Sequence, residues 1–371
     1  MVNQDEDYNL GGTIRARTPL ETLSIIQPYI QRAGITRIAN LTHLDCIGIP
    51  VYTCFRPTSR NLSTSQGKGI TDDLAKCSAY MEGIEHYYSE QLTPEFTRVL
   101  DVRDSAFVLP AQLPRGILRY PPAFKVITSW SASQSLLSNK TRYIPTHYLS
   151  FDLSVVCAES GLFRKSTTGL ASGNTKIEAQ CHAIYEIIER HSLQRFDKSS
   201  HSSKLKRMVD IKTIDHPYAQ ALLQKLQAQH IDVVVFELDS AFKIPVYHCI
   251  IADENPFRKL GHYSGSGCHL NKGIALSRAI TEAIQSRLTY IAGSRDDLFP
   301  QDYNTQWQAL KFTGKRDYRK RADDPTLTLD QQYQCLLQQI EMLKYDVLMV
   351  EHTNAQDTIS VVHALIPELA I

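Results

Sequence analysis

The sequence lacks paired cysteines, an excess of charge and long apolar runs. Its eight cysteines (46, 54, 77, 157, 181, 249, 268 and 335) form no C-x-x-C pair, which argues against a zinc site or a disulfide framework and favours reduced thiols in the cytoplasm. The formal net charge of +1 over 371 residues argues against a nucleic-acid binder that works by bulk electrostatics. No apolar run reaches membrane-spanning length, and the acidic residues 1–7 do not fit a secretory signal.

Familiar nucleotide-binding and hydrolase motifs are also missing. Gly67-Lys68-Gly69 has neither the upstream glycine nor the following Ser or Thr of a Walker loop. The chain contains no H-E-x-x-H, G-x-S-x-G or kinase catalytic-loop motif. A nucleotide would therefore have to be held in another way.

Two predicted helices carry rows of polar side chains on one face. Steps of three and four residues produce these rows, which are Ser78, Glu82 and Glu85 in one helix and Glu178, His182, Glu186 and Glu189 in the other. The rest of each helix is largely apolar, and ionised carboxylates without a partner are costly there. Clustered carboxylates without cysteine ligands suit Mg²⁺. The duplicated row also hints at an internal repeat.

A third predicted helix, at 272–292, adds Arg278 and Glu282 among apolar neighbours. Taken alone, each row fits a solvated helix face, and Arg278 with Glu282 fits an ordinary helical ion pair. Taken together, they favour a nucleotide held by metal ions on the glutamates, with Lys68, Arg190 and Arg278 on its phosphates. Phosphoryl transfer needs this kind of positioning and charge neutralisation.

The predicted elements alternate, which indicates a mixed α/β (α+β) fold. Helices are expected at 19–31, 72–89, 176–196, 216–229, 272–292 and 329–343. Strands are expected at 37–41, 49–55, 151–157, 233–238, 244–252, 347–351 and 359–364. The segments 57–69, 169–175 and 264–268 are expected to be loops or turns, and 100–150 a mixture of loops and short strands. We expect one domain over 1–371, with a core at about 15–365 and a flexible segment 1–14.

The order of these residues resembles the YcaO superfamily. The matching motifs are S-x-x-x-E-x-x-E at 78–85, G-N-T-x-x-E-A followed by E-x-x-E-R at 173–190, and R-x-x-x-E-A at 278–283. Residues 34–39, 48–51 and 65–69 look like the entry segment of the family. The resemblance spans about 15–365 and implies a YcaO-like fold with an ATP site between the carboxylate-bearing helices.

The resemblance also implies roles for individual residues. The Mg²⁺ ligands would be Glu82, Glu85, Glu186, Glu189 and Glu282. The nucleotide would be bound by Arg15, Arg17, Thr22, Lys68, Ser78, Asn174, Glu178, His182, Arg190 and Arg278, of which Lys68, Arg190 and Arg278 would contact phosphates. Catalysis would rest on Glu85, Glu189, Arg190, Arg278 and Glu282.

In this family, the oxygen of a peptide backbone amide is phosphorylated by ATP after or during attack by a nucleophile, and phosphate then leaves. An internal Cys, Ser or Thr nucleophile gives an azoline, sulfide gives a thioamide, and an amine gives an amidine. The resemblance thus implies a peptide or protein substrate, with no nucleic acid and no membrane. Whether the chain forms a homodimer stays open.

Three departures from the family pattern bear on the branch. His86 stands where arginine is common, and His182 stands where glutamine is common and adds pH sensitivity. Residues 366–371 lack the proline-rich ending of azoline-forming cyclodehydratases. The chain therefore looks like the stand-alone, TfuA-associated branch, with a TfuA-like partner that recruits substrate or sulfur. Thioamide formation is the favoured activity, and the alternatives are an azoline-forming cyclodehydratase and a nucleotide-binding scaffold or regulator with little turnover.

Overall fold

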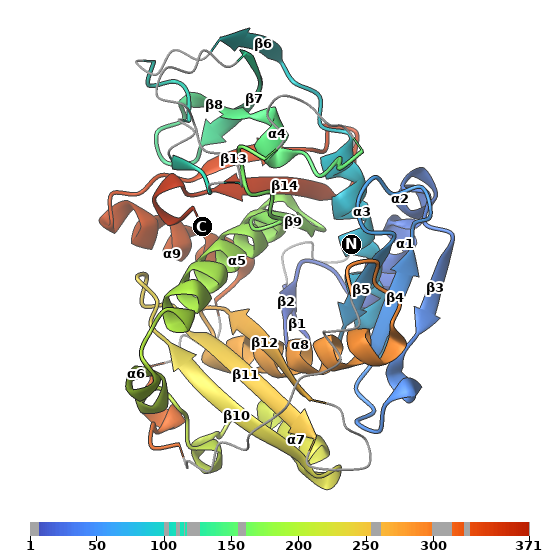
Figure 1. Cartoon of the computed structure of the whole chain (residues 1–371), viewed down its shortest axis with the longest axis vertical. Coiled ribbons are helices and arrows are strands. Elements are labelled where there is room, and N and C mark those ends of the chain that lie inside the picture. Colours follow the sequence, from blue (N-terminus) through green and yellow to red (C-terminus); the bar gives the residue numbers. More distant parts are fainter. Residues whose placement is uncertain are drawn as a thin grey trace, which may run out of the picture.

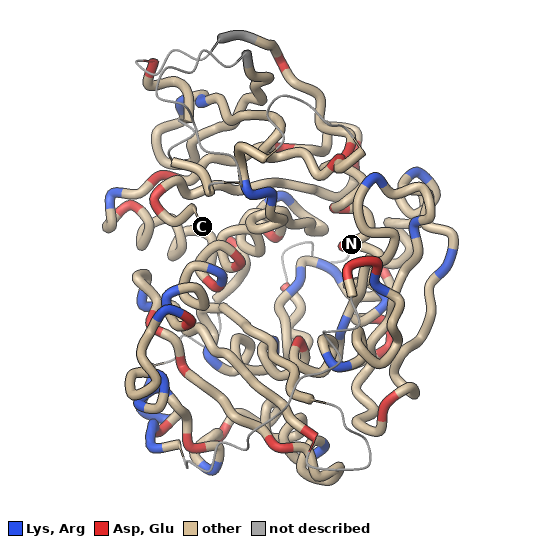
Figure 2. Tube along the Cα trace, in the orientation of Figure 1, with Lys and Arg blue, Asp and Glu red and all other residues tan. Residues whose placement is uncertain are grey.

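Helices and antiparallel sheets alternate along the chain, so the fold is mixed α/β as expected (Figure 1). The computed structural model describes residues 7–99, 104–108, 112–114, 116, 127–154, 161–253, 261–298, 314–322 and 327–370. Acidic and basic segments are interspersed along the trace (Figure 2), in line with the small net charge. In the part of the chain described, no helix combines the length and apolarity needed to cross a membrane.

The first structural unit is a three-stranded antiparallel sheet, in the order β3-β4-β5, with a long helix packed against it. Its sheet leads directly into the helix from the edge strand β5. In chain order the unit contains α1 (Pro19–Ile25), α2 (Gln27–Arg32), β3 (Arg37–Asn40), β4 (Val51–Phe55), β5 (Thr64–Lys68) and α3 (Asp72–Glu90). A 3₁₀ turn at Thr42–Leu44 lies between β3 and β4.

A second unit repeats this order of one helix, three antiparallel strands and one long helix. Its edge strand β12 leads into α8, which packs on the sheet, and α7 packs on α8. The elements are α7 (Pro217–Ala228), β10 (Ile231–Leu238), β11 (Val246–Asp253), β12 (His262–Cys268) and α8 (Lys272–Ala292).

A third unit has the same arrangement but is assembled from two distant parts of the chain. Its helix and first two strands come late in the sequence, as α9 (Leu329–Met342), β13 (Leu348–Glu351) and β14 (Ser360–Leu365). Its edge strand and long helix come from the middle, as β9 (Leu170–Gly173) and α5 (Lys176–Asp197). Green β9 accordingly lies beside red β14 in Figure 1, and the two strands pair from Ser360 opposite Gly173.

The remaining elements extend these units. The third sheet is widened by β6 (Phe96–Val99), β7 (Ile127–Ser135) and β8 (Thr141–Pro145). Two short helices, α4 (Thr146–Leu149) and α6 (His201–Lys206), and 3₁₀ turns at Ile211–Thr213, Tyr318–Lys320 and Pro367–Leu369 complete the connections. Near the start of the chain, β1 (Tyr8–Asn9) and β2 (Ile14–Arg15) form a small hairpin.

Each long helix begins at a side-chain cap, which aligns the three units residue by residue. Thr71, Thr175 and Asn271 each accept a hydrogen bond from a backbone N–H in the first turn of their helix. Counted from these caps, equivalent positions are Glu82 with Glu186 and Glu282, Glu85 with Glu189 and Gln285, and Ser78 with His182 and Arg278. The repeat hinted at by two helices therefore extends to three.

The loop predictions at the three edge strands were wrong. Residues 64–68, 170–173 and 262–268 are strands, although their small and polar residues are typical of turns. The reason is close packing of the long helix on the strand: a Cβ on Gly67 would lie 2.1 Å from the backbone N of Ala79, and one on Gly267 would lie 2.1 Å from the backbone O of Ala275. Only small residues fit there.

Other elements differ less from expectation. The predicted helix at 19–31 divides at Ile26, because Pro28 has no N–H to donate to the preceding turn. The predicted strand at 151–157 is irregular through residue 154, and 155–157 lie outside the described residues. Within 100–150, where loops and short strands were expected, the structure has the strands β7 and β8 and, in addition, the short helix α4.

The tight contact between β5 and α3 predicts that Gly67→Ala destabilises the protein. The added methyl group would meet helix backbone, which cannot rotate away, so we expect a loss of about 1–3 kcal/mol or more in the free energy of unfolding, measured by urea denaturation. Gly48→Ala is the control, because its Cβ would meet nothing within 4 Å and only the positive φ of 69° opposes it. A Gly67→Ala loss no larger than that of Gly48→Ala would contradict the packing argument.

Candidate active site

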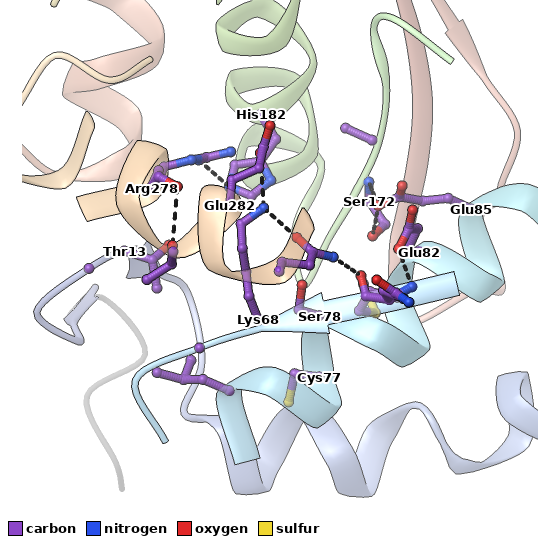
Figure 3. Close-up of a pocket in the computed structure, with 18 of the residues that line it drawn as sticks. Thr13, Lys68, Cys77, Ser78, Glu82, Glu85, Ser172, His182, Arg278 and Glu282 are labelled. Atoms are coloured by element: carbon purple, nitrogen blue, oxygen red, sulfur yellow. Dashed lines mark hydrogen bonds and ion pairs between the residues drawn. The ribbon is translucent and has the colours of Figure 1, made fainter. Parts of the chain in front are cut away.

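A cavity of about 560 Å³ lies where the polar faces of α3, α5 and α8 meet. Every residue that the sequence singled out for ATP, Mg²⁺ or catalysis lines it: Arg15, Arg17, Thr22, Lys68, Ser78, Glu82, Glu85, Asn174, Glu178, His182, Glu186, Glu189, Arg190, Arg278 and Glu282. Figure 3 shows side chains from the three helices directed toward one another across this space. The structure therefore brings the predicted residues together, while the role of each stays a prediction.

Backbone N–H groups in the edge strands, and that of Gly169 directly before β9, hold the glutamates in place. The N–H of Gln66 donates to Glu82 Oε2 at 2.7 Å, and that of Gly169 donates to Glu186 Oε2 at 3.1 Å. Glu85 Oε1 accepts two bonds from Ser172, at 2.8 Å from its N–H and 2.6 Å from its hydroxyl. The strand that precedes each long helix thus also orients carboxylates at the cavity wall.

Several of these carboxylates are harder to ionise than a free glutamate, because the surrounding protein does not fully balance a negative charge on them. Burial, opposed by the hydrogen bonds from Ser172, raises the pKa of Glu85 to about 8, with further repulsion from Glu82 and Glu186. Burial also raises the pKa of Glu82 to about 6, and burial together with the charge of Glu282 raises the pKa of Glu189 to about 7. An added cation would favour the ionised form of each group.

Glu282 differs from the other glutamates because Lys68 neutralises it. Burial alone would raise the pKa of Glu282, but attraction to Lys68 and Arg190 outweighs burial and lowers it to about 2. Lys68 Nζ lies 3.0 Å from Glu282 Oε2 and 2.9 Å from Gln285 Oε1. Gln285 is fixed in turn, since its Nε2 donates to the backbone O of Gln66 at 2.9 Å.

The oxygen donors fit Mg²⁺, although they are not yet gathered around one point. Among the described residues, no three His, Cys, Asp or Glu side chains are close enough to form a ready metal site. The bonds from Gln66, Ser172 and Gly169 explain this, because they draw the carboxylates of Glu82, Glu85 and Glu186 toward the strands. Mg²⁺ takes few protein ligands and keeps waters and phosphate oxygens, so Glu82, Glu85, Glu186 and Glu189 could hold it after small rotations.

A second group of polar contacts lies where the β1–β2 hairpin approaches α5. Arg15 Nη1 donates to Glu178 Oε1 at 3.0 Å, and the N–H of Ala16 donates to Glu178 Oε2 at 3.1 Å. The hydroxyl of Thr22 donates to Asn174 Oδ1 at 3.0 Å. These bonds bring the start of the chain into the cavity wall, together with Leu10, Gly12 and Thr13, which sequence reasoning missed.

The two histidines noted as departures are both held neutral. Burial lowers the pKa of His182 well below its usual value, and the nearby cations Arg15 and Arg278 lower it further. Arg278 Nη1 lies 3.4 Å from His182 Nε2, so the ring offers that guanidinium a lone pair. Burial, with Arg56 and Arg295, lowers the pKa of His86 to about 4. The expected pH sensitivity of His182 near neutrality is therefore wrong.

Sequence reasoning gave no role to several further cavity residues, although Gln66 lies in the segment 65–69 that resembles the entry segment of the family. Ser172 and Gln66 lie on edge strands that looked like loops, and Gln285 replaces a glutamate in the third helix. The interval from each N-cap could have identified Gln285, because it matches that of Glu85 and Glu189. Arg295, beyond the end of α8, also lines the cavity and had no such signal.

The family model described as "YcaO cyclodehydratase, ATP- and Mg²⁺-binding" matches residues 66–370. The chain belongs to the YcaO family. A protein of Mycobacterium tuberculosis is 35% identical over 294 residues, which cover 77% of this chain, and the chain spans 64% of that relative's length. A protein of Rhizobium leguminosarum bv. trifolii, described as lying in the tfuA 3′ region, is 31% identical over 78% of this chain and 70% of its own.

Solved structures share the fold at low sequence identity. YcaO from Methanopyrus kandleri, bound with AMPPCP and Mg²⁺, is 20% identical with a TM-score of 0.72, covering 97% of this chain and 94% of its own. A heterocyclase in complex with substrate and cofactor is 19% identical with a TM-score of 0.75, covering 98% of this chain and 54% of its own. The description of the family model names ATP and Mg²⁺, which are therefore the cofactors of the family to which this chain belongs.

The carboxylate cavity predicts that Glu85→Ala and Glu189→Ala each abolish ATP turnover while the fold survives. Each change removes a proposed Mg²⁺ ligand, so we expect a loss of about 100-fold or more in ATP hydrolysis, with a thermal midpoint that does not fall. Glu341→Ala, on the exposed end of α9, is the control and should leave both quantities unchanged. Full ATP hydrolysis in both cavity variants would exclude a role for these carboxylates.

The raised pKa of Glu85 predicts a pH-dependent gain in stability from Glu85→Gln in the metal-free protein. Because the folded-state pKa of about 8 lies above the ordinary glutamate pKa of 4.5, ionisation destabilises the native state progressively as pH rises between these values. At pH 8.5 we expect Glu85→Gln to raise Tm by about 2–4 °C, and at pH 4.5 we expect little difference from wild type. Melting curves in EDTA measure both, and an equal shift at the two pH values would contradict the assignment.

Proposed function

We propose that this YcaO protein uses ATP to activate a backbone amide in a peptide or protein. The observation that carries the proposal is the cavity in which the glutamates of α3, α5 and α8 meet Lys68, Arg190 and Arg278. Such a site suits a nucleoside triphosphate with Mg²⁺, because carboxylates would hold the metal and the cations would hold phosphate oxygens. The proposed catalytic residues are Glu85, Glu189, Arg190, Arg278 and Glu282.

The chemistry follows from the poor leaving ability of an amide oxygen. Transfer of the terminal phosphoryl group to that oxygen releases ADP, and addition of a nucleophile at the amide carbon then lets phosphate leave with the oxygen. With hydrosulfide as the nucleophile, the amide, ATP and HS⁻ give a thioamide, ADP and hydrogen phosphate. The guanidinium groups of Arg278 and Arg190 would stabilise the charge on the phosphoryl group during transfer.

We favour sulfide from outside the chain as the nucleophile. Among the described cysteines only Cys77 lines the cavity, and burial raises the pKa of its thiol to about 12, so it is a poor sulfur carrier. Leu369, near the end of the chain, is buried in the core and is not among the cavity-lining residues described. The relative from the tfuA 3′ region supports a TfuA-like partner that supplies sulfur or substrate.

Azoline formation is the alternative, because the matching family model is described as a cyclodehydratase and a heterocyclase shares the fold. In that case a Cys, Ser or Thr side chain of the substrate itself would attack the amide carbon. Both activities would use the same nucleotide site. They differ in the product, which gives a direct test.

We predict that peptides encoded beside its gene gain the mass difference between sulfur and oxygen when incubated with the protein, Mg-ATP and sodium sulfide. Mass spectrometry measures the product, and ADP release should rise with added peptide. Glu85→Ala is the control without activity. Loss of one water from the peptide in the absence of sulfide would replace the thioamide assignment with azoline formation. ATP binding without any peptide-dependent turnover would favour a scaffold or regulator.

A further inference from the structure

Helix α3 lines the cavity along most of the helix length, so two ends of the cavity can be defined along the helix axis. The residues that face the cavity recur at helical spacing: Leu74, Cys77, Ser78, Met81, Glu82, Glu85 and His86. At a rise of 1.5 Å per residue, they extend over about 18 Å. Figure 3 shows Thr13 and Cys77 toward one side of the cavity, and Glu85 and Ser172 toward the other. We call these the near end and the far end.

The near end is the more apolar one. Leu10, Ile70, Leu74 and Tyr218 line it, and the hairpin glycines Gly11 and Gly12 pack against Tyr218. A flat purine base needs apolar walls of this kind, whereas phosphates need cations and metal ligands. An ATP molecule in the cavity would therefore direct its phosphates along α3 toward Glu82 and Glu85, and its terminal phosphoryl group would lie closest to the far end.

At the far end, α3 itself supplies no Arg or Lys side chain. Counted from the N-caps, His86 of α3 corresponds to Arg190 of α5. His86 is buried, and its Nδ1 lies 3.4 Å from Ser65 Oγ. The neighbouring Arg56 is buried as well, and its guanidinium is engaged by Glu90 and by Ser59 Oγ at 2.9 Å. The guanidinium that Arg190 gives to the second helix thus has no counterpart in the first.

Arg295 reaches the far end from a different element. Helix α8 ends at Gly293 in the left-handed conformation, with a φ of 57°, and the following loop turns back to the start of β5. Asp296 Oδ2 fixes this loop by accepting from the N–H of Ser63 at 2.8 Å and from its hydroxyl at 2.7 Å. Arg295 lines the cavity there, and Glu82 is among the groups that raise its pKa.

Two hydrogen bonds to Asp297 orient the guanidinium of Arg295 and do not involve its Nη1. Asp297 accepts from its Nε at 2.8 Å and from its Nη2 at 2.6 Å. These two bonds fix the plane of the group and leave Nη1 unused by Asp297. A fixed, planar guanidinium with free N–H groups is well suited to bind phosphate oxygens.

We propose that Arg295 binds the terminal phosphoryl group of ATP at the far end of the cavity and supplies the cation that α3 lacks at His86. The proposal rests on the ATP site of the proposed function, but not on amide activation or on the nucleophile. Arg295 would then distinguish ATP from ADP, because only ATP carries the phosphoryl group that extends to the far end.

The test compares the binding of Mg-AMPPCP and Mg-ADP by titration calorimetry in the absence of peptide. We expect Arg295→Ala to weaken Mg-AMPPCP binding about tenfold or more, the usual effect of losing a charged hydrogen bond, and to leave Mg-ADP binding within about twofold of wild type. Arg295→Lys should recover part of the difference, because it keeps the charge but not the planar group. Equal losses for both nucleotides, or no loss for either, would overturn the proposal.

Arg319→Ala is the matched control. Arg319 forms the same kind of pair with an aspartate two residues earlier in the chain, since Asp317 Oδ1 accepts from its Nε at 3.0 Å. Its side chain is 59% exposed and is not among the cavity-lining residues described. It should bind both nucleotides as wild type does, and a selective loss of Mg-AMPPCP binding in this control would also overturn the proposal. Intact nucleotide discrimination without peptide modification would exclude amide activation and leave the role of Arg295 standing.

Discussion

The structure depends on keeping six glutamates at the wall of one cavity. Their mutual repulsion and burial oppose ionisation, which is why the pKa values of Glu82, Glu85 and Glu189 rise. The protein offsets part of this cost by pairing Lys68 with Glu282 and by directing strand N–H groups at the other carboxylates. We propose that a bound cation balances the remaining charge of the ionised glutamates. The same buried carboxylates would then shape the cavity and create the need for Mg²⁺.

The helices and their glutamates could be predicted because their signals are local. Helical spacing alone placed Glu82 with Glu85 and Glu186 with Glu189, and the bounds of α8 matched the expected 272–292. The edge strands could not be predicted in this way, since glycines such as Gly67 and Gly267, together with neighbouring serines, are typical of turns. Their conformation is dictated by a helix that packs on them, and no pattern within the strand records that contact.

Apart from Arg15 and Arg17, which the family resemblance indicated, the parts of the site that come from connecting segments were equally hidden. The β1–β2 hairpin joins the cavity through the bond from Ala16 to Glu178, two residues far apart in the sequence. Arg295 joins it because Asp296 docks its loop on Ser63. Neither segment has a hydrophobic period, so tertiary contacts alone decide where these side chains lie. The threefold repeat of the strand–helix unit explains why α3, α5 and α8 contribute equivalent side chains to the cavity. The hairpin and the loop of Arg295 add side chains that have no equivalent in the repeat.

The division of one unit between the middle and the end of the chain has a consequence for how the protein is made. During synthesis, the unit of α3 can form early and the unit of α8 follows, but α5 waits for β13 and β14, which are synthesised after both of these units. Until then, the apolar face of α5, including Ile184 and Ile188, lacks part of its cover. We therefore expect Glu186 and Glu189 to take their final places only after β13 and β14 are available, so that nascent fragments without these strands hold an incomplete nucleotide site.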